Sequence, residues 1–226
     1  MLRNKLLIAI TIVCLFISIG GHAACKGLVS LAALNKANPE AASVDYCNNF
    51  ASSSGISDEC ALNSAAVSPI NKAIRKYKVA SRGEIVATLA WMLYESDNWK
   101  YNINHFPGNI GQGTRTMMSW NYVSQYAKQL HPNEYEQAVG SSGDDVSSAN
   151  NSTKTAVIDL VLNNDDSFGA GFWYLTTQAP SFHNNPSKLR DGNMQDFQEY
   201  VQSGIVTSWN SDREAIWTTV NDAIVF

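Results

Sequence analysis

Apolar residues along most of this chain recur every three or four positions, as they do on one face of a helix. The segment 85–94 is apolar at nearly every position instead, which is typical of a helix buried on all sides. Patterns that alternate as strands do are scarce. Further helices are expected at about 121–130, 154–163, 167–177, 193–202 and 212–223. We therefore predict a mainly α fold around a central buried helix, with a small β element at most in the loop 97–116.

Three short motifs indicate where helices begin. Ser81 and Glu84 have the S-x-x-E spacing of a capping box, directly before the buried helix. Ser211 and Glu214 repeat this spacing near the end of the chain. Ser68-Pro69 favours another helix start, because proline fits the first position of a helix.

The first residues have the pattern of an export signal. Arg3 and Lys5 precede an apolar run at 6–19, and small residues follow at 20–24. We predict a cleaved signal peptide at 1–24, a secreted protein, and no membrane attachment after cleavage. An uncleaved membrane anchor and a lipidated Cys25 are the alternatives.

The remaining chain divides into an N-terminal segment, 25–67, and a helical domain that we expect to be catalytic, 68–226. The segment 25–67 is rich in Ala, Ser and Asn, which favours short helices and loops. It holds Cys25, Cys47 and Cys60, and an exported protein with cysteines is expected to form disulfides. Cys47 and Cys60 are close in sequence, but Cys25 could pair with either, so the pairing stays open.

Charge and histidine spacing exclude several classes of partner. Without Arg3 and Lys5, the mature chain has 14 basic against 20 acidic residues, a net charge of −6. It has no basic stripe, which argues against nucleic acid or an anionic membrane as partner. The negative charge also counts mildly against an anionic wall polymer. The four histidines lack the spacing of metal ligands, so no metal site is expected.

Glu95 is the candidate for acid chemistry. It stands at the end of the apolar helix, with Trp91 and Trp99 nearby in the sequence. Burial against aromatic rings raises the pKa of a carboxyl group, and a protonated carboxyl can donate its proton to a glycosidic oxygen. An ordinary solvated residue at a helix end is the alternative that composition alone favours.

Several motifs around Glu95 resemble one superfamily. Glu95-Ser96, the aromatic Trp99, then Gly111-Gln112-Gly113 and Met117 resemble the "E-S … G-L-M-Q" signature of goose-type lysozymes and soluble lytic transglycosylases. The segment 168–175 is similar to a later helix of the same families, and a related secreted fungal muramidase family is a further candidate. The resemblance covers about residues 82–180. It departs from the signature where Gln112 follows glycine by one residue rather than three.

The resemblance implies a lysozyme-like fold with Glu95 as the catalytic acid. The second catalytic group is expected to be Asp97 or Asp166, or else a positioned water. Asp97 can serve only if the helix ends at Glu95, because two residues along a helix turn the side chain to the opposite face. The residues expected to bind substrate are Ser96, Trp99, Gln112, Arg115, Met117 and Tyr174.

The sequence therefore predicts a secreted, monomeric glycoside hydrolase that needs no cofactor and acts on a cell-wall aminosugar polymer. Peptidoglycan is the first candidate substrate, and chitin or chitosan is the second. The alternatives are a lytic transglycosylase and a non-catalytic glycan-binding or effector protein on a lysozyme-like scaffold.

Overall fold

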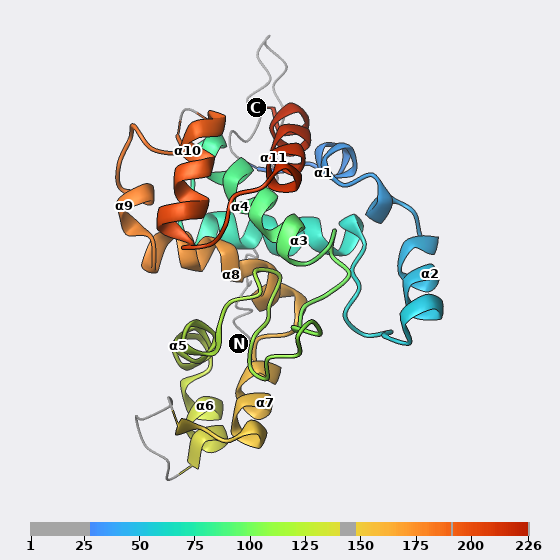
Figure 1. Cartoon of the computed structure of the whole chain (residues 1–226), viewed down its shortest axis with the longest axis vertical. Coiled ribbons are helices and arrows are strands. Elements are labelled where there is room, and N and C mark those ends of the chain that lie inside the picture. Colours follow the sequence, from blue (N-terminus) through green and yellow to red (C-terminus); the bar gives the residue numbers. More distant parts are fainter. Residues whose placement is uncertain (1–27, 141–147, 191, 226) are drawn as a thin grey trace, which may run out of the picture.

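The computed structural model describes residues 28–140, 148–190 and 192–225. This part of the chain is mainly helical and contains no strand, which confirms that the fold is mainly α (Figure 1). Two isolated β-bridges, Ile103 to Gly113 and Gly113 to Met118, are all that forms of the small β element. The elements are α1 (Leu31–Ala37), η1 (Glu40–Ala42), α2 (Asp45–Ser54), α3 (Asn63–Lys76), α4 (Arg82–Glu95), α5 (Trp120–Leu130), α6 (Pro132–Val139), α7 (Asn151–Asp159), α8 (Asn164–Thr177), α9 (Pro180–His183), α10 (Met194–Glu199), the π-helical η4 (Tyr200–Gly204) and α11 (Ser211–Ala223).

Helix α4 is the central helix, as predicted. All its residues from 83 to 93 are buried, and α8 and α11 pack against it (Figure 1). A Cβ atom on Gly171 of α8 would lie 2.7 Å from the sulfur of Met92 and 2.8 Å from Cγ2 of Thr88. Glycine therefore allows α8 to approach α4 closely. Trp91 packs edge to face on Tyr174, with ring centroids 5.1 Å apart.

The helix starts were predicted with mixed success. Ser81 does cap α4, accepting a hydrogen bond from the Glu84 backbone N–H. The residue that caps α11 is Asn210 rather than Ser211, so that prediction is wrong by one position. Asparagine is as good a cap as serine, and here it is the Asn210 side chain that accepts from the Arg213 N–H.

Helix α3 begins at Asn63, six residues before the predicted first helical residue, so Pro69 lies inside the helix. The buried Asn63 side chain donates to Asn38 O at 2.7 Å and accepts from the Trp99 indole at 3.0 Å. These long-range bonds hold the first turn of α3 and are invisible to a local sequence pattern. Pro69 leaves the carbonyl of Ala65 without its helical donor, and water can replace that donor because Ala65 is exposed.

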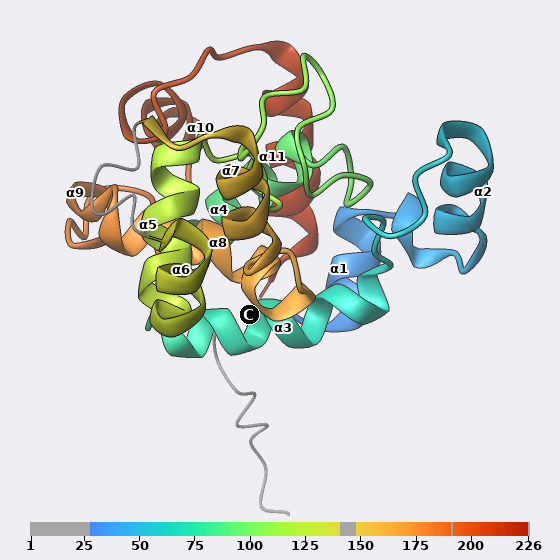
Figure 2. The ribbon, with the colours of Figure 1, turned by 90° about the horizontal axis from the view of Figure 1, so that it is seen from below.

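The N-terminal segment contributes α1 to the core and α2 (Asp45–Ser54) to a lateral arm. Helix α1 packs on α3 and α11, while α2 lies at the edge of the molecule in both views (Figures 1 and 2). A disulfide joins Cys47 of α2 to Cys60, with Cα atoms 5.5 Å apart. Cys25 and the predicted signal peptide at 1–24 lie outside the described residues. In the described part of the chain, every helix is too short or too polar to cross a bilayer.

Candidate functional site

Two adjoining pockets of about 220 and 360 Å³ meet at Glu95 and together form a groove. Glu95, Gln112 and Met117 line both pockets. The first pocket is completed by Tyr94, Tyr101, Ile103, Asn104, His105 and Phe106. The second pocket is completed by Trp91, Thr116, Met118, Ser119, Tyr122, Tyr174, Ile205, Val206 and Thr207. A ligand that occupies both pockets would thus pass directly over the Glu95 carboxyl group.

The backbone after α4 fixes the position of Glu95. Glu95 is the last residue of the helix, and Asp97, Asn98 and Trp99 then adopt positive φ angles of 47°, 57° and 74°. Few residues other than glycine adopt such angles, and runs of them mark places where the surrounding structure holds the chain. The Ser96 hydroxyl stabilises this turn by accepting from the Trp99 N–H at 3.1 Å. The chain therefore leaves the helix sharply, and Glu95 remains at the groove.

Burial and one arginine act in opposite directions on Glu95. The side chain is 20% exposed, and burial, the largest influence, raises its pKa above the ordinary value. Arg213 Nη2 donates to Glu95 Oε1 at 2.7 Å, and this cation lowers the pKa of Glu95. The neighbouring Trp91 indole also lowers this pKa, although it makes no hydrogen bond of normal geometry. The net effect is a raised pKa, which keeps more of the carboxyl group protonated at a given pH.

Arg213 is itself held beneath the groove. It is 4% exposed, and its guanidinium lies 3.8 Å over the centre of the Tyr94 ring. A cation over an aromatic face is attracted by the ring, and this attraction is stronger away from water. Arg213 is thus fixed between Tyr94 and Glu95.

The loop between α4 and α5 forms one wall of the groove. Gln112 is oriented within it, because Nε2 donates to Met117 O at 2.9 Å and Oε1 accepts from Asn109 Nδ2 at 2.8 Å. A Cβ atom on Gly113 would lie 2.5 Å from Asn102 O, so this loop packs tightly on itself. The amide of Gln112 is consequently presented to both pockets in one orientation.

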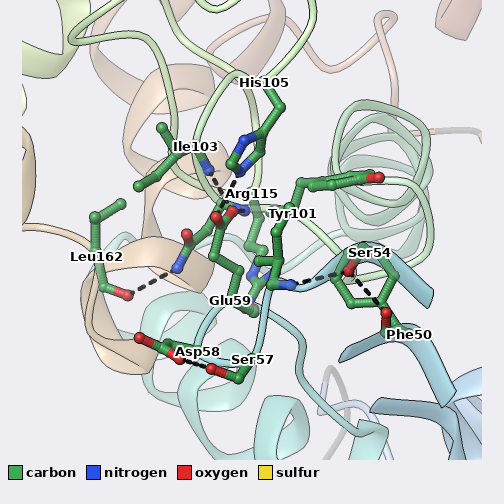
Figure 3. A network of polar contacts seen from close by, with 12 residues as sticks. Phe50, Ser54, Ser57, Asp58, Glu59, Tyr101, Ile103, His105, Arg115 and Leu162 are labelled. Carbon is green, nitrogen blue, oxygen red and sulfur yellow. Dashed lines mark hydrogen bonds and ion pairs between the residues drawn. The ribbon is translucent and has the colours of Figure 1, made fainter. Parts of the chain in front are cut away.

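A polar network behind this wall anchors the loop (Figure 3). The buried Glu59 carboxylate accepts from the backbone N–H groups of Asn102 and Ile103 at 2.9 and 3.0 Å, and it bonds His105 Nε2 at 2.6 Å. Arg115 donates to the carbonyls of Trp99 and Tyr101 at 2.9 Å each, and also to Glu59 O. Burial lowers the pKa of Arg115 to about 10, so this side chain stays charged at neutral pH.

The structure brings three of the predicted binding residues to the groove and assigns the other three a different place. Gln112, Met117 and Tyr174 line it together with Glu95. Ser96, Trp99 and Arg115 line neither pocket and are almost fully buried. Ser96 holds the turn after α4, Trp99 packs on Phe168 with centroids 5.0 Å apart, and Arg115 holds the loop. These three therefore support the wall of the groove from behind.

Neither predicted second carboxylate lines the groove. Helix α4 does end at Glu95, but the left-handed turn carries Asp97 to a separate pocket, where it pairs with Lys100 at 3.0 Å. Asp166 lies in the first turn of α8 and bonds His131 Nε2 and Asn163 Nδ2 at 2.7 Å each. Both aspartates have ordinary roles as ion-pair and capping partners.

Sequence reasoning missed Arg213, Tyr94 and Glu59. Tyr94 stands next to Glu95, so its proximity was available in the sequence. Arg213 is 118 positions from Glu95, and only the packing of α11 on α4 brings them together. Within 28–140, 148–190 and 192–225, no three His, Cys, Asp or Glu side chains gather as a metal site would require.

Comparisons with known proteins give little for this chain. No model of a known protein family matches it, and no solved structure matches it. A bifunctional dioxygenase–epoxy alcohol synthase of Fusarium oxysporum (strain Fo5176) is 36% identical over 111 residues, which are 49% of this chain and 8% of that protein. The chain thus matches only a small part of the relative's length.

This relative contradicts the function predicted from the sequence. It is an enzyme, and its name describes oxygenation and epoxy alcohol synthesis rather than the cleavage of a glycan. The prediction of a muramidase acting on cell-wall polymer is therefore wrong, and so are its glycan-binding, chitinase and transglycosylase alternatives. The motifs that suggested it are short, and half of the residues they indicated support the fold rather than line the groove.

Proposed function

We propose that the groove binds an elongated, uncharged, oxygen-bearing organic molecule and that Glu95 donates a proton to one of its C–O oxygens, so that water can be added. The observation that carries this proposal is the place of Glu95. Its carboxyl group, with a raised pKa, lies where the two pockets join. A carboxylic acid that keeps its proton in a partly water-excluded site is suited to general acid catalysis.

The lining of the groove supports this ligand class. Of the described residues that line the two pockets, Glu95 is the only acid, and none is lysine or arginine. Aromatic side chains such as Tyr94, Tyr101 and Tyr122 suit apolar faces of a ligand, and Gln112 offers hydrogen bonds. An anionic ligand would find no lysine or arginine to pair with here. An elongated ligand would use both pockets.

The name of the Fusarium relative supplies a first chemical class to test, the epoxy alcohols. An epoxide has one uncharged ring oxygen. Protonation of that oxygen by Glu95 breaks a ring C–O bond while a water oxygen bonds to the ring carbon, and the water gives up one proton. The product of an epoxy alcohol is then a triol. The oxygenation reactions named for the relative are not part of this proposal.

The test is whether the purified protein hydrates a long-chain epoxy alcohol. Mass spectrometry measures this reaction, because the product is heavier than the substrate by one water. We expect Glu95→Gln to lower the rate by about 10² or more, because the amide keeps the shape but is not an acid. The exposed Glu136 on α6 offers a matched control, and Glu136→Gln should leave the rate unchanged. Equal rates for wild type and Glu95→Gln, or clearing of a peptidoglycan suspension by the wild type, would contradict the proposal.

Two further proposals concern the location and the oligomeric state of the protein. We propose that the protein acts outside the cell, and the Cys47–Cys60 disulfide is compatible with this location because disulfides persist in oxidising compartments. We also expect a monomer. Fractionation of the producing cells tests the location, and light scattering from the purified protein tests the oligomeric state.

A further inference from the structure

We infer that His105, oriented by Glu59, is the second acid–base group of the groove and takes a proton from the attacking water. This inference rests on the proposed function, since it names the group that completes the same reaction. It starts from two facts of position. His105 lines the first pocket together with Glu95, and its ring points back to the Glu59 carboxylate (Figure 3).

Glu59 is held so that one oxygen serves His105 alone. Its side chain is 10% exposed, and Oε2 accepts from the backbone N–H groups of Asn102 and Ile103. The other oxygen, Oε1, lies 2.6 Å from His105 Nε2. The backbone of Glu59 is fixed as well, because its carbonyl accepts from Arg115 and the next residue, Cys60, is in the disulfide. The carboxylate is thus a rigid support for the imidazole.

This arrangement sets the tautomer of His105. An ionised carboxylate only accepts hydrogen bonds, so the neutral imidazole carries its proton on Nε2. Its Nδ1 then has a free lone pair, and among the described residues Nδ1 has no hydrogen-bond partner. The side chain is 31% exposed, which leaves the ring open to water from the first pocket. A histidine oriented by a carboxylate in this way is a common general base.

The groups around His105 define its charge environment. Tyr101 flanks the ring with centroids 5.4 Å apart, and Phe106 flanks it at 6.4 Å. Glu59 contacts the ring, and Glu95 lines the same pocket. The two acids of this environment therefore have separate tasks, Glu59 to orient the histidine and Glu95 to donate a proton.

The reaction balances with these two groups and water. Glu95 gives its proton to the epoxide oxygen as a C–O bond breaks, and the water oxygen bonds to the carbon that is released. The proton that leaves the water goes to Nδ1 of His105. Glu95 is then a carboxylate and His105 an imidazolium, and proton exchange with solvent restores both groups.

A purely structural role for His105, as an anchor of the loop, gives different results from this proposal. We expect His105→Gln to lower kcat for a long-chain epoxy alcohol by about 10² with little change in KM or in Tm, because the amide can keep a bond to Glu59 but is not a base. Added imidazole should restore part of the rate in His105→Gly. If His105→Gln keeps the wild-type kcat while Glu95→Gln is inactive, this inference is overturned and the proposed function stands.

A second measurement needs no substrate. Nitrogen-15 NMR of the whole protein distinguishes the two neutral tautomers of each histidine. In its neutral form, His105 should show a protonated Nε2 and an unprotonated Nδ1. His131 pairs with Asp166 through Nε2 and lines neither pocket, so it is the matched reference for a tautomer fixed by a carboxylate. If neutral His105 carries its proton on Nδ1, the inference is overturned, independently of the substrate.

Discussion

The behaviour of the site depends on one ion pair between residues far apart in the chain. Arg213 contacts Glu95 at 2.7 Å, and neither Nε nor Nη1 of this arginine has a partner among the described residues. Its position is therefore set by Glu95 on one side and by the Tyr94 ring on the other. Removal of one partner from a buried pair is costly, because the remaining charge stays buried.

Replacing Arg213 tests how far this cation lowers the pKa of Glu95 against the effect of burial. We expect Arg213→Met to raise the pKa of Glu95 further, because burial continues to disfavour the carboxylate while its cationic neighbour is gone. Carbon-13 NMR of the Glu95 carboxyl group measures the shift directly. Arg213→Lys keeps the charge and should raise the pKa less. An unchanged or lower pKa in Arg213→Met would show that Arg213 does not govern this group.

The same pKa has a consequence for the pH dependence of stability. The folded-state pKa of Glu95 is raised above the unfolded value, so the folded state binds more protons between the two values. The contribution of Glu95 to stability is therefore present below the unfolded pKa and is lost as pH rises through the folded pKa. We expect the Tm of wild type relative to Glu95→Gln to fall as pH rises through this window. A Tm difference that is constant with pH would contradict a raised pKa.

At the scale of elements, the groove depends on where helices end and begin. Helix α4 ends at Glu95, and α11 begins after Asn210, whose side chain has two partners. Its oxygen accepts from the Arg213 N–H at 2.9 Å, and its Nδ2 donates to the Tyr94 hydroxyl at 2.7 Å. Asn210 thus joins the start of α11 to the residue beside Glu95.

Asn210→Ala should therefore affect both stability and the site. We expect the free energy of unfolding to fall by about 1–2 kcal/mol, the usual cost of losing an asparagine cap. The Glu95 pKa should also change, since Arg213 loses its fixed position. Asn193 caps α10 in the same way, accepting from Asp196 N at 2.8 Å, and lines neither pocket. In urea denaturation, Asn193→Ala should lose about as much unfolding free energy as Asn210→Ala, but its Glu95 pKa should equal that of wild type. Equal Glu95 pKa values in the two variants would refute the connection between Asn210 and the site.

The close approach of α8 to α4 gives a second test at this scale. A Cβ atom at Gly171 would overlap the side chains of Met92 and Thr88, so Gly171→Ala should cost about 1–3 kcal/mol. This outcome opposes helix propensity, which favours alanine over glycine by about 1 kcal/mol. Asn164→Ala, at the exposed start of α8, should change stability little. A Gly171→Ala variant more stable than wild type would mean that the two helices are not this close.

For the whole molecule, sequence patterns predicted what is local and failed where distant residues meet. The apolar run before Glu95 predicts the central helix, because a helix buried on all sides has no polar face. The start of α3 was misplaced because Asn63 finds its partners at Asn38 and Trp99. Within the groove, Gln112 was found from its motif, whereas Arg213 and Glu59 reach the site only through the packing of α11 and of the disulfide-linked segment.

The disulfide connects the lateral arm to this site and supplies the test at the scale of the whole molecule. In Cys47→Ser/Cys60→Ser the closed loop, with a sequence separation of 13, becomes open in the unfolded chain. We expect the free energy of unfolding to fall by about 3 kcal/mol, mainly because the unfolded chain gains entropy. Since Cys60 follows Glu59 directly, the support of His105 should loosen too, and its Nε2–H tautomer should become less populated by nitrogen-15 NMR. Retention of both the stability and the tautomer in the double variant would show that the arm does not hold the groove.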